Sequence, residues 1–188
     1  MKLISLLEKL EYTCLQGSTD QEVKNVVYDS RKVEEGSLFI CIRGAVVDGH
    51  KFVPDVVAKG AKVLIVEEAV EAPEDVTVIL VKDTRYAMAF ISAAYFGYPA
   101  EKLKTIGITG TKGKTTTTYM VKSILENAGY KVGLIGTIEA IIGDKVIPAK
   151  NTTPESYVIQ EYFHEMAEAG CDCVVMEVSS QGLMLRRT

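Results

Sequence analysis

Short apolar runs alternate with amphipathic stretches along roughly the first hundred residues of the chain. Apolar runs of strand length fall at 23–28, 37–42, 62–66 and 76–81. Helical spacing of apolar residues predicts helices at 1–12, 48–60 and 85–96. Asp83 and Thr84 offer an N-cap for the last of these helices, and Gly60 ends the one before it. This alternation predicts a small α/β domain.

The pattern changes after 85–96, because Pro99 has no backbone donor and disfavours a helical conformation in the residue before it. We place a domain boundary here, with one domain at 1–98 and a second at 103–188. In the second domain, strands are expected at 105–109, 131–135 and 172–178, and helices at 116–128 and 154–169. Such a βαβ order is typical of a parallel sheet, and with only two or three strands we expect this doubly wound sheet to be incomplete.

Composition and charge exclude several classes of protein. The chain has 25 acidic and 21 basic residues, a net charge of −4, so it has no overall basic field for a nucleic acid or an anionic membrane. Its apolar runs are far shorter than the ~18 residues of a membrane helix, and its N-terminus lacks the apolar core of a signal peptide. We expect a cytoplasmic monomer with no nucleic-acid partner and no membrane insertion. The cysteines lack disulfide or zinc spacing, so we expect reduced, buried thiols.

The sequence GITGTKGKTT, residues 107–116, lies between a predicted strand and a predicted helix. Backbone N–H groups of such a turn can hold phosphate oxygens, and the N-terminus of the following helix adds positive charge. Lys114 can bridge two phosphates and the Thr115 hydroxyl can bind Mg²⁺. We expect the nucleotide to be bound by Gly110, Thr111, Lys112, Gly113, Lys114, Thr115 and Thr116. The first glycine of the usual pattern would fall at Ile108, so a plain glycine-rich turn is the alternative.

Glu177 ends the apolar run CVVME and should emerge at the carboxyl edge of the sheet, where open α/β sheets bind ligands. It is the natural second Mg²⁺ ligand beside Thr115. The alternative is a solvated glutamate at a strand end. We assign catalytic roles to Lys114 and Glu177.

The segment GTKGKTT, 110–116, is similar to the phosphate loop of the Mur ligases, a form that the folylpolyglutamate synthetases share. Three further segments resemble Mur ligases of the MurE type: YDSRKVEEGSLFICIRGAVVDGHKF at 28–52, NTTPE at 151–155 and MEVSSQGL at 176–183. The resemblance implies a small N-terminal α/β domain that binds the UDP end of the substrate. An incomplete phosphate-loop central domain with a mainly parallel sheet would follow.

The resemblance also implies site residues. It places Tyr28, Ser30, Ala45, Val46 and Val47 near the uridine nucleotide, and Asn151, Thr152, Thr153, Ser179 and Arg187 near the muramoyl-dipeptide. Judged from residue type alone, the polar members of this set could equally be cap or turn residues, and Thr153 could begin a helix.

The activity implied is ATP- and Mg²⁺-dependent amide formation in peptidoglycan synthesis, and hence in cell wall biogenesis, cell shape and cell division. An acyl phosphate would form on UDP-MurNAc-L-Ala-D-Glu, and the amine of meso-diaminopimelate or L-lysine would displace the phosphate. The family's modified lysine and amino-acid-binding domain would follow residue 188, so this chain alone is expected to be inactive. A folylpolyglutamate-type ligase and a non-catalytic nucleotide-binding module are the alternatives.

Overall fold

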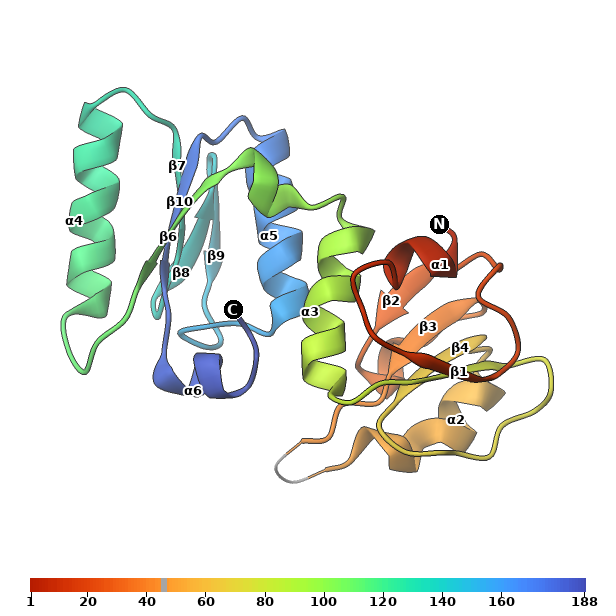
Figure 1. Cartoon of the computed structure of the whole chain (residues 1–188). Coiled ribbons are helices and arrows are strands. Elements are labelled where there is room, and N and C mark those ends of the chain that lie inside the picture. The colour runs from red at the N-terminus through yellow and green to blue at the C-terminus, as the bar shows by residue number, and fades with distance from the viewer. Residues whose placement is uncertain (45–46) are drawn as a thin grey trace. The chain divides into compact units, whose positions relative to one another are not determined.

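The computed structural model describes residues 1–44 and 47–188 (Figure 1). The chain divides into two compact units, Met1–Tyr95 and Phe96–Thr188. Two of the residues that we expect near the uridine nucleotide, Ala45 and Val46, lie outside the described part of the chain. None of the described helices has the length and apolar character needed to cross a membrane.

A five-stranded sheet forms the centre of the N-terminal unit, in the order β1-β5-β4-β3-β2. The parallel strands are β2 (Asn25–Val27), β3 (Ser37–Ile40), β4 (Val63–Val66) and β5 (Thr77–Leu80). They confirm the four predicted strands, with shorter bounds. Strand β1 (Thr13–Gln16) runs antiparallel to β5 and was not predicted. It is a mostly exposed edge strand, so its sequence carries no apolar run.

The helices of this unit are α1 (Leu3–Leu6), η1 (Ser30–Lys32), η2 (Gly49–Phe52), α2 (Val53–Ala58) and α3 (Thr84–Tyr95). Asp83 caps α3 as predicted, because its Oδ1 accepts from the backbone N–H groups of Arg85 and Tyr86 over 2.9 and 3.0 Å. The expected helix at 1–12 is wrong beyond its first turn. Its buried leucines lie within or directly after that turn, and the exposed residues that follow have no core to pack against.

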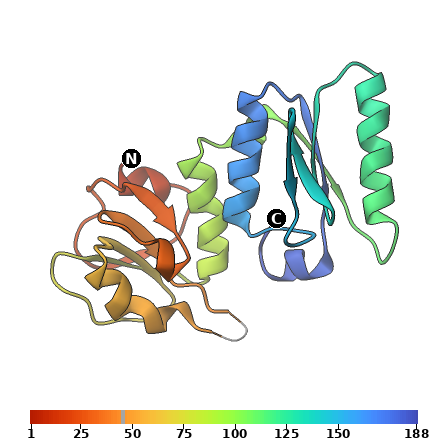
Figure 2. The same cartoon turned by 180° about the vertical axis from the view of Figure 1, so that it is seen from behind.

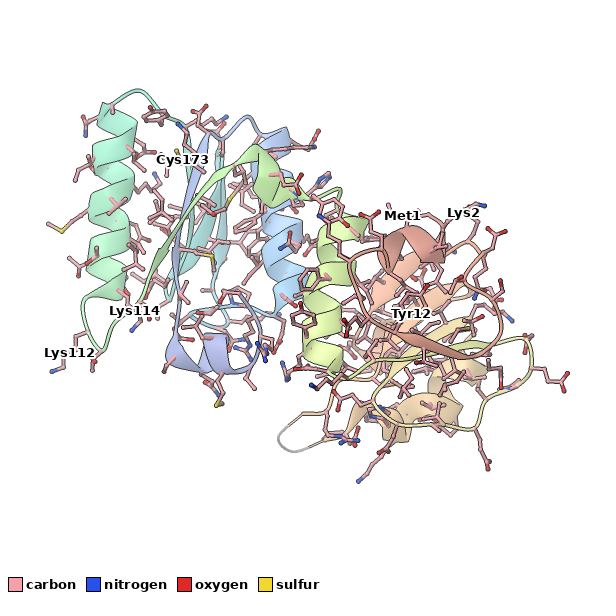
Figure 3. All side chains as sticks on the ribbon, viewed as in Figure 1. Met1, Lys2, Tyr12, Lys112, Lys114 and Cys173 are labelled. Atoms are coloured by element: carbon pink, nitrogen blue, oxygen red, sulfur yellow. The ribbon has the colours of Figure 1, made fainter. Side chains whose placement is uncertain are left out.

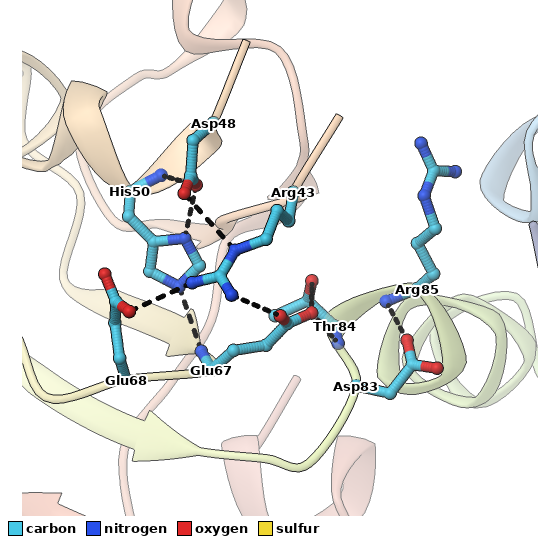
Figure 4. Close-up of polar contacts among 8 residues, drawn as sticks. All are labelled: Arg43, Asp48, His50, Glu67, Glu68, Asp83, Thr84 and Arg85. Atoms are coloured by element: carbon cyan, nitrogen blue, oxygen red, sulfur yellow. Dashed lines mark hydrogen bonds and ion pairs between the residues drawn. The ribbon is translucent and has the colours of Figure 1, made fainter. Parts of the chain in front are cut away.

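A polar cluster joins the segments that follow β3 and β4 (Figure 4). We call Arg43, Asp48, His50, Glu67 and Glu68 the edge network. His50 is buried; its Nε2 accepts from the backbone N–H of Glu67 over 2.9 Å, so its Nδ1–H donates to Asp48 Oδ1, 2.6 Å away. Arg43 pairs with Asp48 at 3.3 Å and with Glu68 at 3.0 Å. Arg43 therefore supplies a positive charge to the carboxylates of this network.

The second unit also has five strands, in the order β6-β10-β7-β8-β9. Parallel pairing joins β6 (Lys104–Ile108), β10 (Cys173–Glu177) and β7 (Val132–Ile135), as predicted. The expectation of only two or three strands is wrong, because β8 (Glu139–Ile142) and β9 (Lys145–Pro148) add an antiparallel hairpin. Its strands are only four residues long, and its two-residue turn, Gly143-Asp144, has the left-handed glycine such turns favour (φ +57°).

Helices α4 (Lys114–Asn127) and α5 (Ser156–Glu168) cover opposite faces of this sheet (Figure 2). Alternate residues of β10 face them: Val174 and Met176 pack with the α5 core, and Cys173 and Val175 pack toward α4. A short 3₁₀ helix, η3 (Pro99–Lys102), precedes β6, and the unpredicted helix α6 (Ser180–Met184) follows β10. Cysteines 41, 171 and 173 are buried free thiols as expected. Cys14 is exposed, because it lies on the edge strand β1.

Candidate active site

The segment between β6 and α4 forms the loop expected to hold phosphate. Gly110 and Gly113 have φ values of +150° and +81°, and the left-handed backbone of Gly113, directly before α4, favours glycine. Helix α4 starts at Lys114, two residues earlier than predicted, so the loop leads straight into the helix N-terminus. Lys114 Nζ donates to the Gly110 carbonyl over 2.9 Å. Figure 3 shows Lys112 and Lys114 at the same end of α4.

The carboxylate of Glu177 is buried beside this loop, with only 1% of the residue exposed. Strand β10 lies between β6 and β7, so its last residue comes next to the turns that follow both neighbours. Oε2 accepts from the Thr115 hydroxyl over 3.0 Å, and Oε1 accepts from the backbone N–H of Thr137 over 2.8 Å. Glu177 is therefore not the solvated glutamate at a strand end that the sequence left open as the alternative.

Glycine is required at position 136 for the carboxylate to sit where it does. A Cβ atom there would lie 2.7 Å from Glu177 Oε1, and Cβ atoms in proteins essentially never come within 3.0 Å of such an atom. The turn after β7 therefore carries a glycine that makes room for the carboxylate and a threonine that donates to it.

Thr115 and Glu177 supply hard oxygen donors of the kind that Mg²⁺ prefers. Within residues 1–44 and 47–188 no group of three or more His, Cys, Asp and Glu side chains is arranged to hold a metal. Thr115 and Glu177 are two oxygen-bearing side chains, and Mg²⁺ usually binds proteins through one or two side chains and takes its other ligands from phosphate and water.

Beside Glu177 lies a cavity of about 330 Å³, which we call the polar pocket. It is lined by Thr137, Lys150, Asn151, Thr152, Thr153, Ser179, Gln181 and Arg187. All five residues expected near the muramoyl-dipeptide are among these, although they come from segments about 30 residues apart. The other three lining residues, Thr137, Lys150 and Gln181, were not predicted from the sequence. Thr137 could have been found, since it follows a predicted strand at the same carboxyl edge as Glu177.

Two of the five predicted residues form hydrogen bonds that hold the walls of the pocket together. Thr153 is buried, and its hydroxyl donates to the Glu177 carbonyl over 2.9 Å and accepts from the Ser179 N–H over 3.0 Å. Arg187 donates to the Thr153 carbonyl over 3.0 Å and to Glu155 over 2.7 Å. Helix α5 starts at Ser156 with Glu155 at its N-cap, so Thr153 does not cap it. Asn151 is exposed and Thr152 is half-buried.

Tyr119 and Glu139 join helix α4, which follows the phosphate loop, to the hairpin formed by β8 and β9. The Tyr119 hydroxyl on α4 donates to Glu139 Oε1 on β8 over 2.7 Å. Burial, and then the hydrogen bond to Glu139, raise the pKa of Tyr119 to about 12. The phenol therefore stays protonated and remains a donor at neutral pH.

The residues expected near the uridine nucleotide follow two neighbouring strands of the N-terminal unit. Half-buried Tyr28 and Ser30 come directly after β2, and Val47, which is exposed, lies in the segment after β3. Between the first two, Asp29 accepts from the Arg31 guanidinium over 2.9 and 2.7 Å, and this lowers its pKa to about 2. A separate cavity of about 510 Å³ in this unit is lined by other residues, among them Tyr12, Glu67 and Lys82.

Comparison with protein families gives two matches in chain order. The model of the "Mur ligase family, catalytic domain" matches residues 22–96, and that of the "Mur ligase middle domain" matches residues 108–188. The chain belongs to the Mur ligase family. The family identified from the phosphate loop and the three further segments is thereby confirmed.

Curated relatives of this Mur ligase chain carry the name UDP-N-acetylmuramoyl-L-alanyl-D-glutamate--2,6-diaminopimelate ligase. The protein of that name from Clostridium perfringens is 53% identical over the whole chain, which covers 39% of that relative. The Bacillus licheniformis protein is 45% identical, and the chain covers 38% of it. The chain therefore spans about two fifths of the length of these relatives.

Solved structures share the fold and confirm the predicted α/β class. The structure of a ligase with the same name aligns with the whole chain at a TM-score of 0.77, with 23% identity and 37% of that chain covered. MurF from Acinetobacter baumannii aligns with 95% of the chain at a TM-score of 0.66, with 27% identity and 36% of that chain covered.

Proposed function

We propose that this chain is the substrate- and nucleotide-binding part of a Mur ligase of the MurE type. The parent enzyme would use ATP to join meso-diaminopimelate to UDP-MurNAc-L-Ala-D-Glu in the cytoplasm, as a monomer. One observation carries the proposal: the buried Glu177 lies 3.0 Å from Thr115 at the phosphate loop, and its other neighbour, Thr137, lines the polar pocket. The names of the relatives support diaminopimelate over L-lysine.

The chemistry assigns a task to each part of the site. A carboxylate is a poor electrophile, so an oxygen of the D-Glu γ-carboxylate first attacks the γ-phosphorus of ATP and ADP leaves. The amine of the third amino acid then attacks the acyl carbon, and phosphate leaves. The loop N–H groups and Lys114 would hold the phosphates, and Thr115 and Glu177 would hold Mg²⁺, whose charge would offset the repulsion between the two anions. The polar pocket orients the dipeptide carboxylate toward the loop.

In the N-terminal unit, we propose that Tyr28, Ser30 and Val47 contact the uridine nucleotide together with Ala45 and Val46. The position of Tyr28 and Ser30 directly after β2 supports this, because open parallel sheets bind ligands at the carboxyl ends of their strands. A folylpolyglutamate-type ligase would use the same phosphate loop. The family match over residues 22–96 and the 53% identity to the Clostridium perfringens protein favour the MurE type.

The test is calorimetry on the 188-residue chain with two ligands, MgADP and UDP-MurNAc-L-Ala-D-Glu. We expect both to bind. Binding of MgADP alone would favour the non-catalytic nucleotide-binding module, and binding of a tetrahydrofolate in place of the UDP precursor would favour the folate-type ligase. Mass spectrometry after incubation with ATP, the precursor and diaminopimelate should detect no tripeptide. Product formed at about 1 per second, an ordinary enzymatic rate, would place the amino-acid site within residues 1–188.

A further inference from the structure

The hydroxyl of Thr137 lies between the buried carboxylate of Glu177 and the wall of the polar pocket. Its oxygen is 3.1 Å from Glu177 Oε2 and 3.0 Å from Thr152 Oγ1. Thr115 donates to the same Oε2 over 3.0 Å. These four side chains come from four separate segments and form one continuous chain of hydrogen bonds, which we call the hydroxyl chain.

The number of protons fixes the direction of these hydrogen bonds. An ionised carboxylate only accepts, so the single hydroxyl proton of Thr137 must point at Glu177 for the 3.1 Å contact to be a hydrogen bond. The 3.0 Å contact with Thr152 then requires Thr152 to donate to Thr137. In this arrangement the Thr152 hydroxyl presents only its lone pairs to the polar pocket.

We propose that Thr137 is a positioning residue that couples the metal site to the hydrogen-bonding character of the polar pocket. When Glu177 and Thr115 share their oxygens with a divalent cation, Oε2 becomes a weaker acceptor. The Thr137 proton can then turn to Thr152, and the Thr152 proton turns toward the pocket. No proton leaves its oxygen; only the O–H directions change.

The kind of ligand group that the polar pocket prefers therefore depends on whether the cation is bound. With the metal site filled, the pocket offers a donor to an anionic group such as a carboxylate, and without the cation it offers an acceptor. This deepens the proposed function and rests on it, since it takes the pocket ligand to be the carboxylate-bearing precursor. Coupling must be reciprocal, so the precursor also tightens binding of the cation. One added hydrogen bond to a charged group corresponds to about a fivefold change in affinity or more.

The test compares how strongly Mg²⁺ affects precursor binding in matched variants of the 188-residue chain. UDP-MurNAc-L-Ala-D-Glu is titrated in the presence of ADP, once with Mg²⁺ and once with EDTA, and the ratio of the two affinities is recorded. For the wild type we expect a ratio of about five. Thr137→Val removes the hydroxyl, keeps the backbone N–H that holds Glu177 and should lower the ratio about fivefold relative to the wild type. Thr137→Ser keeps the hydroxyl and should retain the wild-type ratio.

Two further variants separate the coupling from other effects. Thr117→Val, at an exposed position on α4 outside the hydroxyl chain, should leave the ratio unchanged. Thr152→Val should remove the coupling and also weaken precursor binding under both conditions, because Thr152 lines the pocket. Any effect of Mg²⁺ on the diphosphate of the precursor itself is the same for all variants.

The outcomes are distinct. A wild-type ratio in Thr137→Val, with the precursor bound, overturns the inference and leaves the proposed function intact. Failure of the wild type to bind the precursor under either condition overturns the proposed function and the inference with it. Thermal unfolding of each variant, and its affinity for MgADP, report whether the metal site is still formed.

Discussion

Each unit places acidic side chains at or after the carboxyl ends of its parallel strands, half-buried or exposed in the N-terminal unit and buried at Glu177 in the second, and the two units surround these side chains differently. In the N-terminal unit, Asp48 and Glu68 pair with Arg43, and Asp48 also accepts from His50. In the second unit, Glu177 is contacted by hydroxyls and a backbone N–H, and no ion pair to it occurs within residues 1–44 and 47–188. The same edge of the same kind of sheet thus carries one cluster of carboxylates with a cation of its own and one carboxylate held by neutral donors alone.

This difference is the one we expect between a structural network and an ion-binding site. A carboxylate held by its own guanidinium contributes to the fold and has little affinity left for an added cation. A carboxylate held only by neutral donors is kept in place while its charge stays available, which is how a protein prepares an ion site. Variants that remove a charge or a hydrogen-bond donor from one unit at a time test this contrast, if ligand affinity and the free energy of unfolding are measured separately.

The largest expected effect is on nucleotide binding. Lys114→Ala should weaken MgATP by about a hundredfold or more, because a charged contact to phosphate is lost. Within residues 1–44 and 47–188 the Lys114 ammonium hydrogen-bonds only the Gly110 carbonyl, so thermal unfolding should hardly change. Lys112→Ala removes a charge from the same loop and should change affinity less than about threefold. Equal nucleotide affinity of the Lys114→Ala variant and wild type in calorimetry would mean that the loop does not hold phosphate.

Changing the charge at Glu177 should affect the metal and not the fold. Glu177→Gln keeps an acceptor for the Thr137 N–H, and its amide can donate to the threonine hydroxyls, so stability should stay within about 1 kcal/mol of the wild type. The advantage that Mg²⁺ gives to ADP binding should fall about tenfold. Titration of ADP with and without Mg²⁺, alongside urea unfolding, measures both. A large loss of stability with an unchanged Mg²⁺ effect would reverse the contrast between the two units.

The edge network should show the opposite behaviour. His50→Ala leaves the buried Glu67 N–H without its acceptor and removes the donor to Asp48, which should cost about 2 kcal/mol of unfolding free energy. MgADP affinity should not change, since the nucleotide loop belongs to the other unit. His50→Gln can restore one of the two hydrogen bonds and should recover part of the loss. Weakened MgADP binding by a folded His50→Ala protein would contradict the assignment.

The smallest effect concerns Asp29, between the predicted uridine contacts Tyr28 and Ser30. The hydrogen bond from Arg31 lowers the pKa of Asp29 from its ordinary value of 3.8 to about 2. A depressed pKa means that the stabilisation is complete above pH 3.8 and is lost as the pH falls through 2. The difference in unfolding free energy between wild type and Asp29→Asn should therefore shrink across this interval. A difference that stays constant from pH 5 to pH 2 would show that the pair contributes nothing.

The sequence predicted elements and residues whose signal is local. The strands β3, β4 and β10 are continuous apolar runs, the phosphate loop is a contiguous motif, and Glu177 ends an apolar strand. The strand and the residue roles that the sequence did not predict depend on contacts between segments that are far apart in the chain. The strand β1 becomes a strand only by pairing with β5, about 60 residues away, and the role of Thr153 depends on contacts with Glu177 and Ser179. Thr137 follows a predicted strand at the same edge as Glu177, but its hydrogen bonds to the Glu177 carboxylate exist only because β10 pairs with β7.

Gly136 and Gly113 restrict amino-acid substitution for different physical reasons. Gly113 has open space around it and is restricted by its left-handed backbone, so asparagine, which tolerates that conformation, is the mildest replacement there. Gly136 has no such restriction on its backbone, but even alanine would press against the Glu177 carboxylate. In a library selected for Mg²⁺-dependent nucleotide binding, position 113 should therefore keep a few asparagines while position 136 keeps glycine alone. The asparagines that survive at position 113 would distinguish a conformational constraint from a steric one.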